Sequence, residues 1–168
     1  MRRRITRCRA IGAYDGALRS IVHALKYDGR RSLADPLAVR MRDCGRWVLD
    51  NADVLVPVPL HPSRRRERGF NQAADLAKRI GLPVAPILRR VRPTVAQTTL
   101  AAGQRHGNVR GAFAATRRAA DFSGCIVVVV DDVSTTGATL ESCARALLER
   151  GIGEVRALTA ARVVTRPR

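Results

Sequence analysis

Two adjacent carboxylates followed by a loop of hydroxyl-bearing residues are the most informative feature of this 168-residue chain. The carboxylates are Asp131 and Asp132. The loop consists of Ser134, Thr135, Thr136, Gly137, Ala138 and Thr139. Carboxylates accept hydrogen bonds from hydroxyl groups, whereas hydroxyl and backbone N–H donors face phosphate oxygens. The segment therefore indicates a site that binds hydroxyl groups at one end and an anion at the other.

The apolar residues on either side predict the elements that position this site. The β-branched run 126–130 is too short for a helix and is typical of a strand buried on both faces of a parallel sheet. The apolar residues from Leu140 to Leu148 repeat at helical spacing, so the loop leads into a helix N-terminus, which favours a phosphate. The carboxylates then lie at the carboxyl edge of the strand, where open α/β sheets bind ligands.

Three other interpretations of the segment can be compared with its residues. A nucleoside-triphosphate P-loop is excluded because no lysine follows Gly137. A phosphoacceptor receiver domain would need most of its sheet after the acidic pair, and only 36 residues follow Asp132. An ordinary strand and capped helix, with Thr135 or Thr136 as the N-cap, accounts for one threonine but not for the paired carboxylates.

Residues 127–139 resemble the 5-phosphoribosyl-1-diphosphate (PRPP) binding motif of type I phosphoribosyltransferases. That motif has four apolar residues, two acids and a Thr-Thr-Gly-x-Thr loop, and every position matches here. The resemblance implies that the loop from Ser134 to Thr139 holds the ribose 5-phosphate. It also implies that Asp131 and Asp132 accept hydrogen bonds from the ribose 2- and 3-hydroxyls.

A second cluster narrows the family. A short apolar strand, Asp53 to Leu60, contains Val-Pro-Val-Pro and is followed by Arg-Gly-Phe-Asn-Gln at 68–72. These motifs resemble the ComF family of phosphoribosyltransferase-like proteins, which includes competence-associated and GntX-like members. A matching flexible arm spans residues 88–111. The residues that carry the match are Arg92, Thr94, Gln97, Leu100, Arg105, Asn108 and Phe113.

The resemblance also implies a diphosphate site. The turn at Val56, Pro57, Val58, Pro59 and Leu60 corresponds to the loop whose backbone amides hold pyrophosphate oxygens. That loop often contains a strained peptide, and we predict a cis bond between Val58 and Pro59, where the cis form costs little. Among the basic residues 64–68 we favour Arg68, which alone falls in the Arg-Gly-Phe-Asn-Gln pattern. The alternative is a solvated basic turn.

The strand and helix pattern predicts one α/β domain of the type I phosphoribosyltransferase-like fold, spanning residues 1–168. We expect a mainly parallel sheet with helices on both faces. Residues 1–50 would form a small N-terminal hood with flanking helices, and residues 51–168 the core. Lys26 matches a position of the ComF pattern; it either faces the ligand or is a solvated charge at a helix end.

Charge and composition bear on partners. The net charge is +17 and the pI is about 11.6, so the surface attracts polyanions. The stretch from Leu76 to Ala120 has no acidic residue. This stretch suits either a small diphosphate or a nucleic-acid backbone, although 4% aromatic residues offer little stacking surface. The histidines His23, His61 and His106 are isolated in sequence, so we assign no general base and no metal ligands.

The sequence also sets expectations about compartment and assembly. It has neither a signal peptide nor a transmembrane span, so we expect a cytoplasmic protein without membrane contact. The cysteines are scattered, and the four-cysteine zinc module of many ComF-type proteins is missing before residue 8, although a start codon further upstream stays open. Phosphoribosyltransferase-like folds often pair, which leaves a homodimer open.

Two functions follow from the resemblance. The first is a Mg²⁺-dependent phosphoribosyltransferase that transfers ribose 5-phosphate to a nucleobase-like acceptor, for example in nucleotide salvage. Mg²⁺ would be held by substrate and water rather than by protein side chains, and the arm, with Arg92, Thr94, Gln97 and Arg105, would close to exclude water. The second is a non-catalytic PRPP-binding or DNA-uptake accessory protein.

Overall fold

The computed structural model describes residues 4–91 and 111–164. The strands are β1 (Cys8–Ala13), β2 (Val54–Pro57), β3 (Leu88–Arg90), β4 (Phe113–Ala115), β5 (Ile126–Ser134) and β6 (Glu154–Arg162). The helices are α1 (Gly16–Tyr27), α2 (Ala34–Cys44), α3 (Arg46–Leu49), α4 (Pro62–Arg68), α5 (Gln72–Ile80) and α7 (Ala138–Leu148), with 3₁₀ turns η1 (Arg31–Leu33) and η3 (Arg117–Phe122). None of the helices in these ranges is long and apolar enough to span a membrane.

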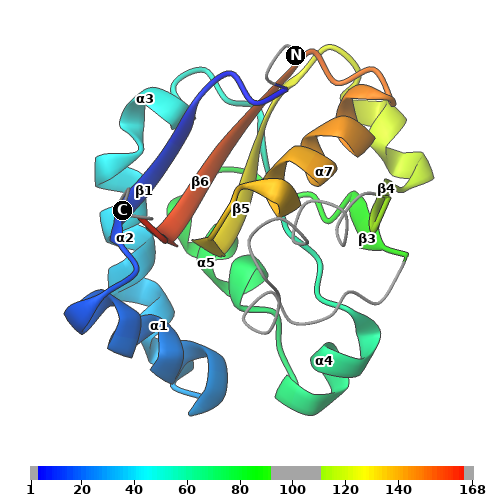
Figure 1. Cartoon of the computed structure of the whole chain (residues 1–168). Coiled ribbons are helices and arrows are strands. Elements are labelled where there is room, and N and C mark those ends of the chain that lie inside the picture. The colour runs from blue at the N-terminus through cyan, green and yellow to red at the C-terminus, as the bar shows by residue number, and fades with distance from the viewer. Residues whose placement is uncertain (1–3, 92–110, 165–168) are drawn as a thin grey trace.

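The main sheet has four parallel strands in the order β1-β6-β5-β2 (Figure 1). Its centre is β5, whose residues 127–130 are fully buried. Side chains of this run alternate between the two faces of the sheet, so Val127 and Val129 pack in one hydrophobic cluster and Val128 and Val130 in the other. The predicted parallel sheet, with a β-branched strand buried on both faces, is confirmed.

Helices cover both faces of this sheet, as expected. On one face, α1, α2, α3 and α5 enclose the cluster that contains Leu25, Met41 and Leu76. On the other face, α7 and the antiparallel β3–β4 pair enclose the cluster that contains Leu147 and Phe113 (Figure 1). The fold is therefore the α/β architecture that the strand and helix pattern predicts.

Two strands differ from the sequence expectation. Residues 8–13, in the part assigned to the hood and its flanking helices, form the edge strand β1, which pairs with β6. The strand at the start of the arm is β3, Leu88–Arg90, while Val84 makes a single bridge to Leu55. The stretch 88–111 that we assigned to the arm therefore begins with a strand.

Ion pairs connect the N-terminal helices to the core. Arg31 pairs bidentately with Asp75 of α5, at 2.7 and 2.9 Å, and Arg79 of α5 pairs with Asp35 of α2 at 2.7 Å. Buried Arg156 of β6 donates to the carbonyl oxygens of Val48 and Asp50 at the end of α3. These contacts fix α2 and α3 on the sheet beside the strand that carries the acid pair.

Candidate functional site

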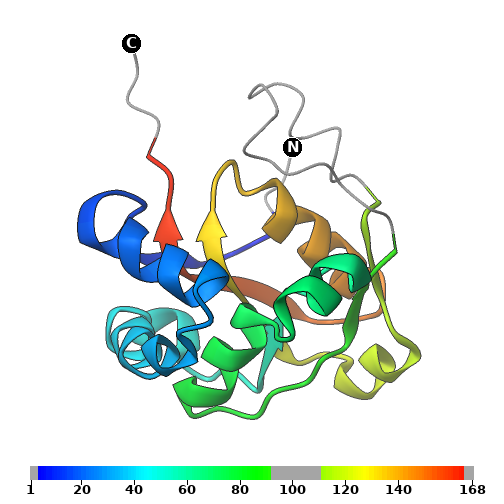
Figure 2. The same ribbon diagram turned by 90° about the horizontal axis from the view of Figure 1, so that it is seen from below.

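An open cleft of about 380 Å³ lies beyond the carboxyl end of β5. Both α1 and α4 lie at this end of the sheet, where the β5 and β6 arrows point (Figures 1 and 2). The cleft is lined by Tyr14, Lys26, Tyr27, Val58, Pro59, Leu60, Arg64, Glu67, Arg68, Asn71, Gln72, Arg90, Asp131, Asp132, Val133, Thr135 and Thr139. The structure thus brings the two sequence motifs, which are about sixty residues apart, to one cavity.

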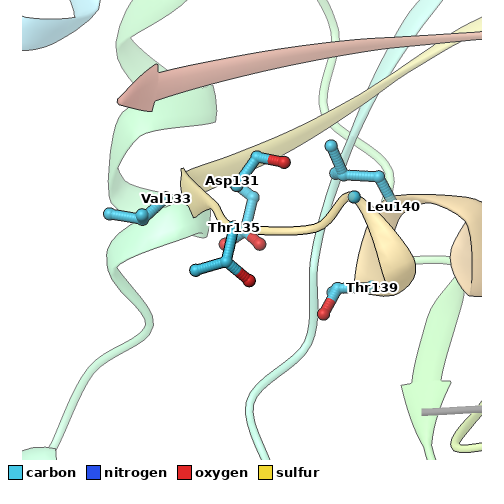
Figure 3. Close-up of a pocket in the computed structure, with 7 residues that line it drawn as sticks. Asp131, Val133, Thr135, Thr139 and Leu140 are labelled. Atoms are coloured by element: carbon cyan, nitrogen blue, oxygen red, sulfur yellow. The ribbon is translucent and has the colours of Figure 1, made fainter. Parts of the chain in front are cut away.

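The hydroxyl-bearing loop forms the floor of a small pocket at the end of β5 (Figure 3). This pocket is lined by Asp131, Val133, Ser134, Thr135, Gly137, Thr139 and Leu140. Gly137 has a φ of +79°, a backbone conformation that residues other than glycine rarely adopt. It precedes the first residue of α7, Ala138. The N-terminus of an eleven-residue helix therefore opens onto the pocket.

The residues of this loop are not equivalent. Thr135 and Thr139 line both the small pocket and the cleft. The Thr136 hydroxyl accepts a hydrogen bond from the Ala138 N–H at 3.4 Å, in a local turn before the helix cap Gly137. Ser134 is the last residue of β5 and is 9% exposed. The threonines at 135 and 139 are thus the side chains best placed to face a phosphate.

The acid pair lies within the last residues of the strand β5 rather than after it. The strand β5 continues to Ser134 because β6 pairs with it as far as Arg162, and Asp131 lies opposite Thr159. Burial, followed by the charge of Asp132, raises the pKa of Asp131 from 3.8 to about 7. Asp131 is therefore partly protonated near neutral pH.

The partner of Asp132 comes from the hood. Lys26 Nζ, at the end of α1, lies 3.0 Å from Asp132 Oδ1, and the two side chains are 15% and 5% exposed. Burial alone would lower the pKa of Lys26, but the charges of Asp132 and Asp131 and the hydrogen bond to Asp132 leave it raised. The Oδ2 atom of Asp132 is buried and has no hydrogen-bond partner within the described residues. Of the two alternatives for Lys26, the structure shows the first: Lys26 faces the cleft and is not a solvated charge at a helix end.

Arginines also line the cleft. Arg64 and Arg68 belong to α4, and Arg90 ends β3. The pKa of Arg90 is lowered, first by burial and then by the charge of Arg64, so two guanidinium groups share a partly desolvated space. The cleft therefore offers both carboxylates and guanidinium groups to a ligand.

Arg68, the predicted diphosphate ligand, lies in the cleft but contacts an aromatic ring. Its guanidinium carbon is 4.7 Å from the centroid of Tyr27, the residue after Lys26. Tyr27 is 60% exposed and its ring also lies 4.7 Å from that of His23. Such a cation–π contact is worth about 0.5–1 kcal/mol at exposed sites, so it leaves Arg68 available to an anion.

The predicted diphosphate loop is only partly correct. Val56 and Pro57 belong to β2 and pair with Val129 and Val130 inside the sheet, away from the cleft. Val58, Pro59 and Leu60 do line it. However, the Val58 N–H donates to Val130 O at 2.9 Å, and Pro59 has no N–H, so the amides of these two residues cannot bind an anion.

The predicted cis bond between Val58 and Pro59 is wrong, since no peptide bond in the described ranges is cis. The basic residues are also not a solvated turn. Residues 62–68 form α4, which begins at the cap residue His61 and ends at Gly69, whose φ is +73°. This helix carries Arg64 and Arg68 into the cleft.

Several lining residues were not singled out from the sequence. They are Tyr14, Tyr27, Arg64, Asn71, Gln72 and Arg90. Gln72 is 4% exposed and its Oε1 has no hydrogen-bond partner in the part of the chain that the structure describes. Its position at the end of Arg-Gly-Phe-Asn-Gln was the available signal. Arg90 had a weaker signal, its place in the stretch without acidic residues.

The arm residues Arg92, Thr94, Gln97 and Arg105 lie outside the described residues. Within residues 4–91 and 111–164, no three side chains of His, Cys, Asp or Glu are grouped closely enough to hold a metal ion. The predicted Mg²⁺, held by substrate and water rather than by protein side chains, stays a prediction.

Comparison with known proteins agrees with the fold and the motifs. The phosphoribosyl transferase domain family matches residues 64–167. One solved structure with the same fold, an allosteric regulatory enzyme of purine biosynthesis, superposes with a TM-score of 0.50 at 22% identity, over 82% of this chain and 30% of that one. The class is therefore a phosphoribosyltransferase-type α/β domain.

Curated relatives define the family more narrowly. Competence protein F of Haemophilus influenzae is 32% identical over 155 residues, which cover 86% of this chain and 68% of that protein. DNA utilization protein YhgH of Salmonella typhimurium is 34% identical over 159 residues, 87% and 67% of the two chains. Competence protein ComFC of Bacillus subtilis is 34% identical over 103 residues, 61% and 41%. This chain belongs to the ComF family, as its motifs predicted.

Proposed function

We propose that this protein binds PRPP and transfers its ribose 5-phosphate to a nucleobase-like acceptor. The observation that supports this most strongly is the convergence of three kinds of group in one cleft. The acid pair, Thr135 and Thr139 of the phosphate loop, and the arginines of α4 and β3 all line it. PRPP carries the three matching kinds of group: hydroxyls, a 5-phosphate and a diphosphate.

Each group has a role that follows from its chemistry. The hydroxyls of Thr135 and Thr139 and the amides at the start of α7 would donate to the 5-phosphate. Asp131 and Asp132 would accept from the ribose hydroxyls. Arg64, Arg68 and Arg90 would bind diphosphate oxygens and stabilise the negative charge that develops as diphosphate leaves ribose C1.

Mg²⁺, when bound with the ligand, would neutralise part of the diphosphate charge. The chain itself would orient the ribose and its leaving group. The transition state of such a transfer has oxocarbenium character at C1, and the acid pair would hold the sugar ring while that charge develops. The predicted arm would exclude water that could hydrolyse PRPP.

The acceptor side of the cleft would be the hood. Tyr27 offers an exposed aromatic ring at the edge of the cleft, on the helix that also carries Lys26. Aromatic rings stack with nucleobases by about 1–3 kcal/mol per base. This surface supports a planar acceptor.

The proposal is tested by replacing both carboxylates. Asp131→Asn with Asp132→Asn should abolish PRPP binding in calorimetry with Mg²⁺ present while the circular dichroism spectrum is kept. Diphosphate release from PRPP across a panel of nucleobases then tests turnover. Unchanged PRPP affinity in the double variant would remove the assignment of the site.

A second function is an accessory role in DNA uptake. It is supported by the names of the relatives, which refer to competence and DNA utilization, and by the net charge of +17. This role predicts DNA binding that persists at physiological salt and is insensitive to the acid pair, whereas non-specific adhesion weakens steeply as salt rises. A salt titration of DNA binding with the same double variant separates the two functions.

A further inference from the structure

The acid pair is neutralised by a residue of the hood. Lys26 extends from the end of α1 to Asp132, with 3.0 Å between Nζ and Oδ1. Both side chains are largely buried, so this contact belongs to the floor of the cleft rather than to a solvated surface pair. The other oxygen, Oδ2, is buried and has no hydrogen-bond partner within the described residues.

An ammonium group at this position competes with a metal ion. Two adjacent carboxylates at the mouth of a cleft attract Mg²⁺ or Mn²⁺, which bind carboxylate oxygens and complete their shell with water. An ion bound to Asp132 would lie within a few ångströms of Nζ. Repulsion between two cations is strong in such a place, because burial reduces screening by water and salt.

We propose that Lys26 is a built-in counter-ion that keeps free divalent cations off Asp131 and Asp132. A divalent ion would then enter the cleft only on the phosphates of the ligand, whose negative charge offsets the repulsion from Lys26. The last step rests on the proposed function; the exclusion of free ions from the acid pair does not. Lys26 thus acts as a positioning residue that determines which form of the ligand, metal-loaded or free, the site receives.

The test is a Mn²⁺ titration of the ligand-free protein, followed by water proton relaxation. Lys26→Met keeps an unbranched apolar stem of similar length and removes the charge. We expect no stoichiometric Mn²⁺ site in the wild type. Lys26→Met should have one site per chain, with an affinity at least about tenfold higher than any Mn²⁺ binding by the wild type. Adding Asp132→Asn to that variant should remove the site. Lys78→Met, on the exposed side of α5, is the matched control and should bind like the wild type.

The opposite results overturn the inference. One is a wild-type protein that already binds one Mn²⁺ at a site lost in Asp132→Asn; the other is a folded Lys26→Met protein without any gain. If Lys26→Met does not fold, judged by circular dichroism and melting, Lys26→Gln must show the gain in its place. The wild-type titration decides by itself if neither folds.

A parallel titration with PRPP distinguishes this inference from the proposed function. In the wild type, PRPP should bring Mn²⁺ into the protein. Failure of PRPP to do so would count against the proposed function and leave the result for the ligand-free acid pair unchanged.

Discussion

The two walls of the cleft differ in how their parts are assembled. On the β5 wall, the acid pair and the phosphate loop occupy nine consecutive residues, Asp131 to Thr139, from the last part of β5 to the start of α7. On the hood wall, Lys26 and Tyr27 act through partners far along the chain, Asp132 and Arg68. The first wall is positioned by local hydrogen bonding and the second by packing of the whole domain.

This difference has a consequence for substitutions. A change on the β5 wall should affect ligand contacts directly, since those side chains face the pocket. A change on the hood wall should act by releasing the partner of the altered residue, Asp132 or Arg68. Substitutions can test this distinction, and the first concerns the packing of the sheet that supports both walls.

The largest effect is expected at Arg156. This buried side chain joins β6 to the end of α3 and pairs with Glu154 at 2.8 Å. Arg156→Met should lower the free energy of unfolding by about 3 kcal/mol, because it leaves two carbonyl oxygens without their donor and removes the cation beside Glu154, which keeps its hydrogen bond from Thr6. Urea unfolding measures this, with exposed Arg40→Met as the control. A loss no greater than that of the control would show that α3 is held by apolar packing alone.

The next effect distinguishes neighbouring threonines of the loop. Thr139→Val should weaken binding of ribose 5-phosphate about ten- to a hundredfold, because a hydrogen bond to a charged group is worth about 1.5–3 kcal/mol. Thr136→Val should cost about 1 kcal/mol of stability, since its hydroxyl accepts a hydrogen bond from the Ala138 N–H in the turn before α7, and change affinity little. Calorimetry and melting measure the two properties. Equal losses of affinity in both variants would contradict the assignment.

The third prediction concerns pH. With a pKa of about 7, Asp131 is largely protonated below neutrality in the ligand-free protein, and hydroxyl donors favour its ionised form. The affinity for PRPP should therefore rise with pH, about tenfold per unit below pH 7. Asp131→Asn should remove the part of the pH dependence that is due to Asp131. The pH dependence that remains in this variant gives the contribution of protonation of the ligand itself. A slope equal in both proteins argues against Asp131 as the titrating group.

The same raised pKa has a defined sign for stability. The folded protein holds the proton of Asp131 more tightly than the unfolded chain, in which the pKa is near 3.8. The contribution of this group to folding is therefore greatest at low pH and decreases as the pH rises from about 4 to about 7. Melting temperatures of the wild type and Asp131→Asn across this range provide an independent measurement.

The smallest effect is expected on the hood wall. Tyr27→Leu removes the ring that Arg68 contacts, so inorganic diphosphate should bind about two- to fivefold more tightly, which corresponds to the 0.5–1 kcal/mol of an exposed cation–π contact. Tyr27→Phe keeps a ring and should change little. Weaker diphosphate binding in Tyr27→Leu would mean that the ring positions Arg68 for the ligand instead of competing for it.

Local patterns predicted the β5 wall because each signal there is contiguous. The sequence shows these signals in order: the β-branched run, the two acids and Gly137, which adopts a left-handed conformation. The exact end of the strand was not, since β5 reaches Ser134 only because β6 pairs alongside it. The edge strand β1, Cys-Arg-Ala-Ile-Gly-Ala, lacks such a run and is exposed in part, so composition did not reveal it.

Elsewhere some signals were present but were not used. Pro62 and Gly69 flank α4 with the usual start and stop residues of a helix, but no helix was predicted there. The contacts of Lys26 and Tyr27 depend on where α1 packs, which no local pattern specifies. The diphosphate loop was misjudged because the pairing of β2 with β5 uses the Val58 N–H.

Lys26 and Tyr27 are consecutive, and both lie at the end of α1. A shift of this last helical turn that separates Lys26 from Asp132 would also separate Tyr27 from Arg68. The groups proposed for the sugar and for its leaving group would then be released together by one backbone displacement. Binding of one end of the substrate should therefore raise the affinity of the site for the other end, because the adjacent residues Lys26 and Tyr27 move together.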